Sequence, residues 1–478
     1  MAPIEDIMDI PAFRKHAHEV VEWICDYYEQ LENLPVKSLV SPGAIRDQLP
    51  SSPPAQGESF DTIWKDFQEI VLPGMTHWQH PHFHAYFPAN TSLPSILGEM
   101  ITASLAAQCM IWDTSPAAAE LEERVMEWLR HAYGLPHSWQ GVIQDTASTA
   151  TLVSLLTARE KHSSWQGNKS GLQDLPVYRI YASTEVHSSL DKAVQIAGLG
   201  LENLIKLPVD EHRSLLPDAL EEAIRKDLAE GFTPLCVVIA IGSTSTLAVD
   251  PLDPIAKICE AHDLWLHIDA AYAGNALLLP EYRWMIKGIE RADTFVTNPH
   301  KWLFTNFDLS AYFVKDRDAL VRTFSILPEY LKTATTGKVN DYRDWGIALG
   351  RRFRALKLWF VLRTYGIEGL QQTLRNHIAW ADWFAEQVKG NPNLELVTPL
   401  FLNMVCLRAL QPDRSLEEIN DYNQQWLGNI NDSGKAYLTH TKVDGKYTIR
   451  VVLGQTYLQK KHVEELWTWM LEAMPEGK

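Results

Sequence analysis

Short apolar runs alternate with amphipathic stretches over the middle of the chain, between about residues 86 and 320. The apolar runs are rich in β-branched residues and cover residues 177–183, 235–243, 264–271 and 294–298. Helical patterns cover 187–199 and 251–262, between successive runs. Strands that are apolar on both faces and separated by helices are typical of a mainly parallel sheet. The sequence therefore predicts an α/β domain whose ligands bind at the carboxyl ends of the strands.

Helical patterns also lie on both sides of this region. Residues 11–34 and 60–71 have apolar side chains at helical spacing, and a connector rich in proline, serine and glycine separates them. A long helical region covers 351–389, and strand, helix, strand and helix patterns follow it. We therefore expect three parts: an N-terminal helical arm (1–85), a large domain (86–385) and a small C-terminal α/β domain (386–478).

The amino-acid composition argues against several classes of function for this protein. Of the 478 residues, 46% are hydrophobic and 22% are charged, as in a folded globular protein. The net charge of −17 disfavours binding to nucleic acid and to anionic membranes. The five cysteines are scattered, which favours a reduced, cytoplasmic compartment over a disulfide framework. We expect no signal peptide and no membrane span, because neither apolar pattern is present.

Two charged residues stand at the ends of predicted strands. Asp269 lies in LWLHIDAAYAG and Lys301 in TFVTNPHKWLF, 32 positions apart, the length of one strand–helix–strand unit. A buried lysine with a lowered pKa is a Schiff-base nucleophile. A carboxylate is its usual partner in pyridoxal phosphate sites, where it keeps the ring nitrogen protonated. A surface lysine and a loop-capping aspartate would explain either motif alone, but both motifs at this spacing favour the pyridoxal phosphate interpretation.

Six motifs in this order resemble the group II pyridoxal phosphate-dependent decarboxylases, and among these the aromatic L-amino acid decarboxylases. The motifs are THWQHPHFHAYFPAN, VIQDTASTATL, STEVHSSLDKA, HIDAAYAG, NPHKWLF and GRRFRALKLWFVLR. The resemblance implies a fold-type I homodimer that binds pyridoxal 5′-phosphate, with residues 1–85 wrapped around the partner subunit. It also implies decarboxylation of aromatic L-amino acids to arylalkylamines and carbon dioxide.

The resemblance assigns cofactor contacts to several of these motifs. Residues 146–148 form a turn before an apolar helix, where N–H groups can bind the cofactor phosphate together with Asn298. His187 matches the histidine that stacks on the pyridine ring, and Thr244 the residue near the ring hydroxyl. Asp145 departs from the pattern, because many relatives have glycine there and a carboxylate near a phosphate is unfavourable unless it points away. The expected cofactor-binding residues are Ala147, Ser148, His187, Thr244, Asp269, Ala271, Asn298, His300 and Lys301.

A second set of matches concerns the substrate side chain. The residues expected to line its pocket are Trp78, Tyr86, Phe87, Pro88, Met110 and Gly350. These aromatic residues argue against a non-aromatic substrate such as histidine or glutamate. Gly350 matches a position that is glycine in indole-accepting plant relatives and serine in phenol-accepting ones. The resemblance therefore favours tryptophan, while tyrosine, phenylalanine and DOPA stay open as substrates.

Residues 326–342 are polar with little periodicity, which predicts a mobile lid loop. The resemblance implies that this loop closes over the partner's active site, where Tyr330 delivers a proton to the substrate Cα. Tyr330, Lys301, His187 and Asp269 form the expected catalytic set. Because aldehyde-forming relatives replace either His187 or Tyr330, their presence together favours a decarboxylase over an aromatic acetaldehyde synthase. The presence of all four residues also argues against a catalytically inactive dimer in which the cofactor has only a structural role.

Two further features receive structural interpretations. The histidines of HWQHPHFHAYF would share one face of a strand from His80 onward, a conceivable metal site. No cysteine or carboxylate joins them, so we expect exposed histidines on a sheet edge and no metal. Asp250 precedes a proline at a helix start, and we expect it to cap that helix.

Overall fold

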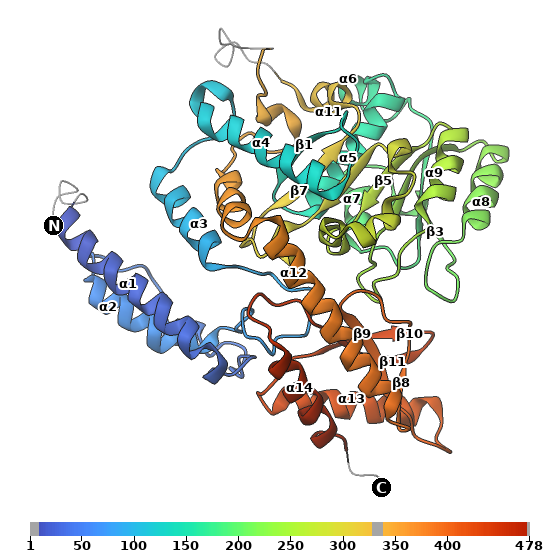
Figure 1. Cartoon of the computed structure of the whole chain (residues 1–478). Helices are drawn as coiled ribbons and strands as arrows, with labels where there is room; N and C mark the ends of the chain where they lie inside the picture. Colours follow the sequence, from blue (N-terminus) through green and yellow to red (C-terminus); the bar gives the residue numbers. More distant parts are fainter. Residues whose placement is uncertain (1–8, 327–337, 476–478) are drawn as a thin grey trace. The chain divides into compact units, whose positions relative to one another are not determined.

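The computed structural model describes residues 9–326 and 338–475 (Figure 1). The chain divides into two compact units. The smaller unit comprises the N-terminal segment up to Tyr86, Ala409–Val451 and the segment from Tyr457 onward. The larger unit comprises Phe87–Arg408 and Val452–Thr456. The boundary at residue 386 expected from the sequence remains a prediction.

A seven-stranded sheet forms the centre of the larger unit, in the order β1-β7-β6-β5-β4-β2-β3. Its strands are β1 (Gln140–Gln144), β2 (Tyr178–Ser183), β3 (Leu204–Leu207), β4 (Thr233–Ala240), β5 (Trp265–Asp269), β6 (Thr294–Thr297) and β7 (Ser310–Val314). Neighbours from β3 to β6 are parallel, whereas β7 runs antiparallel to both β6 and β1. The prediction of a mainly parallel α/β sheet is therefore confirmed.

Helices of the larger unit surround this sheet in Figure 1. They are α3 (Leu93–Leu105), α4 (Pro116–Tyr133), α5 (Ala147–His162), α6 (Gln166–Ser170), α7 (Ser189–Ile196), α8 (Pro217–Ala229), α9 (Leu252–Ala261), α10 (Pro299–Trp302), α11 (Arg317–Phe324) and α12 (Arg354–Gly390). Two short strands follow α12, namely β8 (Leu394–Leu396) and β9 (Met404–Ala409). The long helical region expected over 351–389 is present as α12, with a kink at Gly366.

The connection between β5 and β6 differs from the expected strand–helix–strand unit. It consists of three short 3-10 helices: η8 (Ala273–Leu278), η9 (Pro280–Ile286) and η10 (Ile289–Arg291). Pro280 lacks the N–H that a continuous α-helix would need at that point. The compact crossover brings Asp269 and Lys301 back to the same edge of the sheet.

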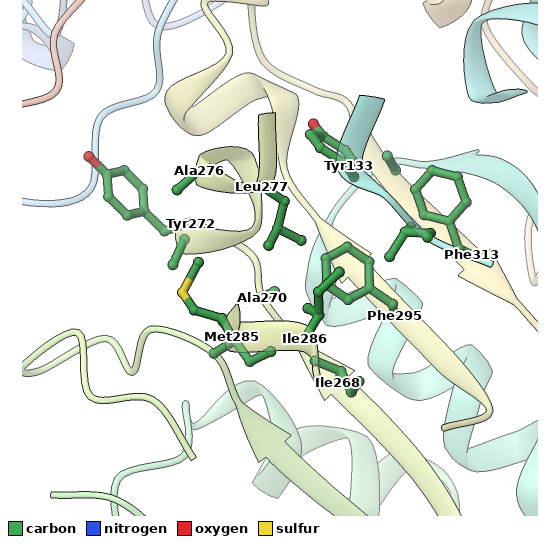
Figure 2. Close-up of a cluster of buried hydrophobic side chains, with 14 of the residues drawn as sticks. Tyr133, Ile268, Ala270, Tyr272, Ala276, Leu277, Met285, Ile286, Phe295 and Phe313 are labelled. Carbon is green, nitrogen blue, oxygen red and sulfur yellow. The ribbon is translucent and has the colours of Figure 1, made fainter. Parts of the chain in front are cut away.

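Alternating residues of the central strands divide the core into two layers. On β4, Val237 and Ile239 belong to a cluster that includes residues of α4, α8 and α9. Cys236 and Val238 face the opposite side, in a cluster with Leu155 of α5. Figure 2 shows part of the first layer, where side chains of β5, β6 and β7 lie beside those of α4, η8 and η9. Burial on both faces fixes the strand register, and with it the residues at the carboxyl ends.

The smaller unit contains helices from both ends of the chain. They are α1 (Ile10–Gln30), α2 (Phe60–Asp66), α13 (Leu416–Asp432) and α14 (Lys460–Glu472). Trp23 of α1 makes ring contacts with Trp64 of α2 and with Phe67 in the helical segment after it. Strands β10 (Thr439–Val443) and β11 (Lys446–Val452) pair antiparallel as a hairpin. Among the described residues, no helix is long and apolar enough to cross a membrane.

The expectation of exposed histidines on a sheet edge is wrong. His77, His80, His82 and His84 are all buried, and they lie in turns and irregular segments. His77 Nδ1 lies 2.9 Å from the Tyr27 hydroxyl, and His82 Nε2 lies 3.1 Å from a Glu465 carboxylate oxygen. Burial lowers the pKa of His80 to about 4. Burial also lowers the pKa of His77 and His82, which favours the neutral imidazole in both. These two side chains join segments that are far apart in the sequence.

Asp250 does not cap α9 as expected. The helix begins at Leu252, and the buried Asp250 carboxylate accepts the N–H groups of Leu215 (2.7 Å) and Ala240 (2.8 Å). Burial raises the pKa of Asp250 to about 6. The side chain therefore fixes the end of β4, from which the next residues lead to the cavity described below.

Helices α3 and α12 are in close contact at Gly98, where a Cβ would lie 2.7 Å from the Lys357 Cα. We expect Gly98→Ala to lower the free energy of unfolding by about 1–3 kcal/mol, because backbone must move to admit the methyl group. Gly369→Ala is the matched control in α12, since the nearest atom, Tyr365 Cβ, lies at an ordinary 3.8 Å. The control should be neutral or stabilising by up to about 1 kcal/mol. Urea unfolding of both variants checks this, and equal effects would contradict it.

Candidate active site

One cavity, of about 200 Å³, lies at the carboxyl ends of the central strands of the larger unit. It is lined by Phe87, Thr146, Ala147, Ser148, His187, Ser189, Ala240, Gly242, Ser243, Thr244, Asp269, Ala271, Tyr272, Asn298, His300, Lys301 and Phe307. The structure thus brings together every residue expected to bind the cofactor. Their motifs are far apart in sequence and meet because parallel strands end at one edge.

Lys301 lies on α10, a single helical turn that directly follows β6. Its side chain enters the cavity, and the Nζ atom lies 5.3 Å from the centre of the Phe87 ring. Burial lowers the pKa of Lys301, and the negative charge of Asp269 partly opposes this shift. A lowered pKa leaves a larger share of the amine neutral, as a nucleophile requires.

Asp269 is the last residue of β5 and lines the same cavity. Its Oδ1 accepts the N–H of Ala271 at 3.0 Å, which orients the carboxylate within its own loop. The oriented carboxylate is available to a cationic group bound in the cavity.

The His187 ring is fixed by the first turn of α7. Its Nδ1 accepts the N–H of Ser189 at 3.1 Å and lies 2.9 Å from the Ser189 hydroxyl. The proton of the neutral ring is therefore on Nε2. Burial lowers the pKa of His187, Asp269 opposes the shift, and Lys301 adds to it. The neutral imidazole can lie against a ring without adding charge.

The start of α5 forms another wall of the cavity. Thr146 is its N-cap, and residues 146–148 line the cavity. The first N–H groups of a helix lack partners within it and can bind an anion. The Asp145 carboxylate accepts the Thr146 N–H at 2.6 Å, so one N–H of this turn is already used.

These residues fit pyridoxal phosphate. The cavity offers a helix N-terminus for a phosphate, a carboxylate for a pyridinium nitrogen and a buried amine for an aldehyde. Backbone on the cavity wall is also close-packed: Gly242 has a φ of 85°, and a Cβ there would lie 2.5 Å from the Ala273 Cβ. Glycine is therefore required next to the cofactor cavity.

Only one of the residues expected to bind the substrate side chain lines this cavity. Phe87 lines the cavity, and its ring stacks on Tyr272 with centres 4.0 Å apart. Trp78 and Tyr86 belong to the smaller unit, where their rings stack on each other at 5.8 Å. Pro88 is in the larger unit but is not among the residues that line the cavity.

Two more expected residues, Met110 and Gly350, lie away from this cavity. Met110 is in the larger unit, where its carbonyl accepts the Arg343 N–H at 2.9 Å. Gly350 lines a second cavity, of about 350 Å³, together with Gln108 and the arginines of GRRFR. Tyr330 lies outside the described residues. Within one chain, Gly350 therefore does not share the cavity of Lys301.

Several lining residues were not predicted. Tyr272 follows Asp269 within HIDAAYAG, and Gly242 precedes Thr244 within IGSTST, so the motifs themselves could have indicated both. Ser189 could have been found from its spacing to His187. Phe307 carries no local sequence signal, because only the loop after α10 brings it to the cavity.

Comparison with known proteins agrees with this geometry. Residues 42–410 match the pyridoxal-dependent decarboxylase conserved domain. The chain belongs to this family. It is 43% identical over 470 residues to tyrosine decarboxylase 2 of Narcissus pseudonarcissus, covering 96% of this chain and 93% of that protein. It is also 43% identical over 470 residues to phenylacetaldehyde synthase of Arabidopsis thaliana, covering 96% and 95%.

A solved structure shows the same fold. The crystal structure of Oryza sativa TDC with PLP and tryptamine superposes with a TM-score of 0.95 at 35% identity, covering 98% of both chains. The chain is accordingly a pyridoxal phosphate-dependent carboxy-lyase of the aromatic amino acid decarboxylase and aldehyde synthase group. Which amino acid it uses is a separate question, because relatives of comparable identity differ in substrate and product.

A substitution at Asp145 can test whether residues 146–148 bind the cofactor phosphate. Asp145→Asn keeps an oxygen to accept the Thr146 N–H but removes a negative charge beside the expected phosphate position. We expect tighter binding of pyridoxal phosphate to the apoprotein, by about three- to tenfold, or about 1 kcal/mol. Fluorescence titration measures the affinity. Pyridoxal, which lacks the phosphate, is the control ligand and should bind both proteins equally. An equal gain for both ligands would show that the charge does not act on the phosphate.

Proposed function

We propose that this enzyme decarboxylates aromatic L-amino acids, with tryptophan preferred, to give arylalkylamines and carbon dioxide. The observation that carries the proposal is one cavity that holds a buried lysine amine, an oriented carboxylate and a neutral imidazole beside an aromatic wall. The wall consists of Phe87 stacked on Tyr272. A flat aromatic surface next to Lys301 suits a flat substrate side chain.

When bound, pyridoxal phosphate supplies the electron sink for loss of the carboxylate from the substrate Cα. Lys301 would hold the cofactor and give it up to the amino group of the incoming substrate. Asp269 would keep the ring nitrogen protonated, and His187 would lie against the ring face. After carbon dioxide leaves, Tyr330 delivers a proton to Cα, which completes the amine.

The proton step separates two candidate functions. The Arabidopsis relative is named as a phenylacetaldehyde synthase and is as similar to this chain as the Narcissus decarboxylase is. In an aldehyde synthase, oxygen reacts where a decarboxylase places the proton. The presence of both His187 and Tyr330 supports the decarboxylase.

A homodimer is part of this proposal. Helix α3 exposes an apolar stripe, each of whose side chains is 39% exposed or more. The stripe consists of Leu93, Leu97, Met100, Ile101 and Leu105. A continuous apolar helix face of this kind is typical of a subunit interface. We propose that a second copy covers it and brings its Gly350 and Tyr330 to the Lys301 cavity.

The compartment we propose is the cytoplasm. All five cysteines are free thiols, and four of them are buried. Thiols that persist unpaired in a folded chain are usual in a reducing compartment.

A substrate panel tests the function. L-Tryptophan, L-tyrosine, L-phenylalanine, L-DOPA, L-histidine and L-glutamate are each incubated with the holoenzyme, and amine, aldehyde, carbon dioxide and oxygen are measured. We expect amine without oxygen uptake and the highest kcat/KM for tryptophan. Aldehyde with oxygen uptake from the unaltered enzyme would identify a synthase, and preference for histidine or glutamate would contradict an aromatic substrate.

Gly350→Ser should lower kcat/KM for tryptophan about 10- to 200-fold more than for tyrosine, because the added side chain crowds the indole. The same substrate panel measures this, and equal losses on both substrates would show that Gly350 does not determine selectivity.

Composite sites are tested with two variants that each lack normal amine-forming activity. Tyr330→Phe keeps the ring but loses the phenolic proton, so it should release carbon dioxide and form mainly aldehyde. Lys301→Ala should form no product. Mixing the two should restore about a quarter of the amine-forming activity if each site draws on both subunits.

The matched control for this mixture is Tyr330→Phe with the Lys301→Ala/Tyr330→Phe double variant, in which no site regains the phenol. Heterodimers that are verified by mass spectrometry but make no more amine than this control would place Lys301 and Tyr330 in the same subunit's site.

A further inference from the structure

A buried asparagine outside the expected site is bonded to the backbone of Lys301. Asn90 is 1% exposed and lies three residues after Phe87. Its Nδ2 donates to the Lys301 carbonyl at 2.6 Å and to the Gly454 carbonyl at 2.7 Å. Its Oδ1 accepts the Thr456 N–H at 3.0 Å. The side chain therefore joins three segments of the larger unit that are far apart in sequence.

Each polar atom of this side chain has a partner. An amide side chain has two N–H donors and one carbonyl oxygen, and all are used here. Turning the amide over would set its oxygen against two carbonyl oxygens, so one orientation is strongly preferred. The hydrogen bonds therefore hold the Asn90 side chain in a single orientation.

The Lys301 backbone needs such an external contact. Helix α10 has only four residues, and so short a helix is unstable alone. Carbonyls in the last turn of a helix have no partner within it. The Asn90 side chain supplies one for Lys301, and the Asn90 N–H donates to the His300 carbonyl at 2.9 Å.

The contact continues along the chain. Residues 90–95 run beside residues 300–306, because the Ser92 hydroxyl donates to the Phe304 carbonyl at 2.8 Å and the Asn306 N–H donates to the Ser95 hydroxyl at 2.8 Å. The segment that presents Phe87 to the cavity therefore also holds the loop that carries Lys301.

We propose that Asn90 is a positioning residue for Lys301: its amide fixes the backbone of α10 so that Nζ enters the cavity beside Asp269. The inference rests on Lys301 as the cofactor-binding lysine but not on which amino acid is decarboxylated. It distinguishes two tasks within the 87–95 segment: Phe87 forms part of the aromatic wall, and Asn90 holds the lysine.

Two substitutions separate positioning from folding. Asn90→Asp is nearly isosteric and keeps the acceptor for Thr456, but it cannot donate to the Lys301 and Gly454 carbonyls. Asn90→Ser is a milder change that shortens the side chain. Ser92→Ala is the matched control, because it removes the neighbouring bond to the Phe304 carbonyl and leaves Asn90 in place.

The principal measurement does not depend on turnover. Full-length apoprotein is mixed with saturating pyridoxal phosphate well below its melting temperature, samples are reduced with borohydride at set times, and pyridoxyl-Lys301 is quantified by peptide mapping. We expect both Asn90 variants to label Lys301 at least tenfold more slowly than the unaltered protein, and Ser92→Ala to stay within twofold. In steady state, kcat should fall more than KM rises.

The competing interpretation is that Asn90 only stabilises the fold. Variants that melt at a lower temperature but label Lys301 at the unaltered rate would overturn the positioning role. Slowing by Ser92→Ala as strong as that by Asn90→Asp would also overturn it, since any loosening of the segment would then suffice. Labelling of a different lysine in the unaltered protein would overturn both this inference and the cofactor assignment. Failure of the substrate panel with normal Lys301 labelling would affect only the proposed function.

Discussion

The site depends on keeping one amine out of water beside one carboxylate. Burial lowers the pKa of Lys301, and Asp269 limits how far it falls. An unpaired charge in this cavity would be unfavourable in free energy. A neutral amine near a carboxylate can react as a nucleophile, and the amine can then take up a proton again. Asp269 is the last residue of β5, and Lys301 lies on α10 directly after β6, where two buried layers fix the strand register. The sheet therefore brings the two groups to the same edge.

Much of this arrangement could be predicted from the sequence, because local patterns carry it. Doubly buried strands followed by Asp269 and by Lys301 predicted the parallel sheet and the edge where the site lies. The family resemblance placed His187, Thr244 and Asn298, and all three line the cavity. These residues sit directly beside regular elements, so their neighbours in sequence reveal their neighbours in space.

What could not be predicted depends on contacts between distant segments. The buried histidines of the smaller unit were expected on the surface, because their partners Tyr27 and Glu465 are far away in sequence. Asp250 was expected to cap a helix, but the N–H groups of two other segments bind it. Asn90 ends the first of the six motifs, but the motif does not indicate its role, since that role depends on the distant Lys301 and Gly454 carbonyls. The pattern of buried positions predicts a helix or a strand. It does not predict which distant backbone groups form hydrogen bonds with the polar side chains of that element.

The bond between Asn90 and Gly454 also bears on how the protein is made. Lys301 emerges from the ribosome long before residues 452–456, yet the larger unit includes this late segment. Asn90 cannot complete its hydrogen bonds until the segment has been synthesised and has joined the unit. The positioning role proposed for Asn90 therefore disfavours cofactor capture by a nascent chain, even though the strands around the cavity are made earlier. Translation that stops before residue 452 would release a chain that has every expected catalytic residue but an incompletely held lysine.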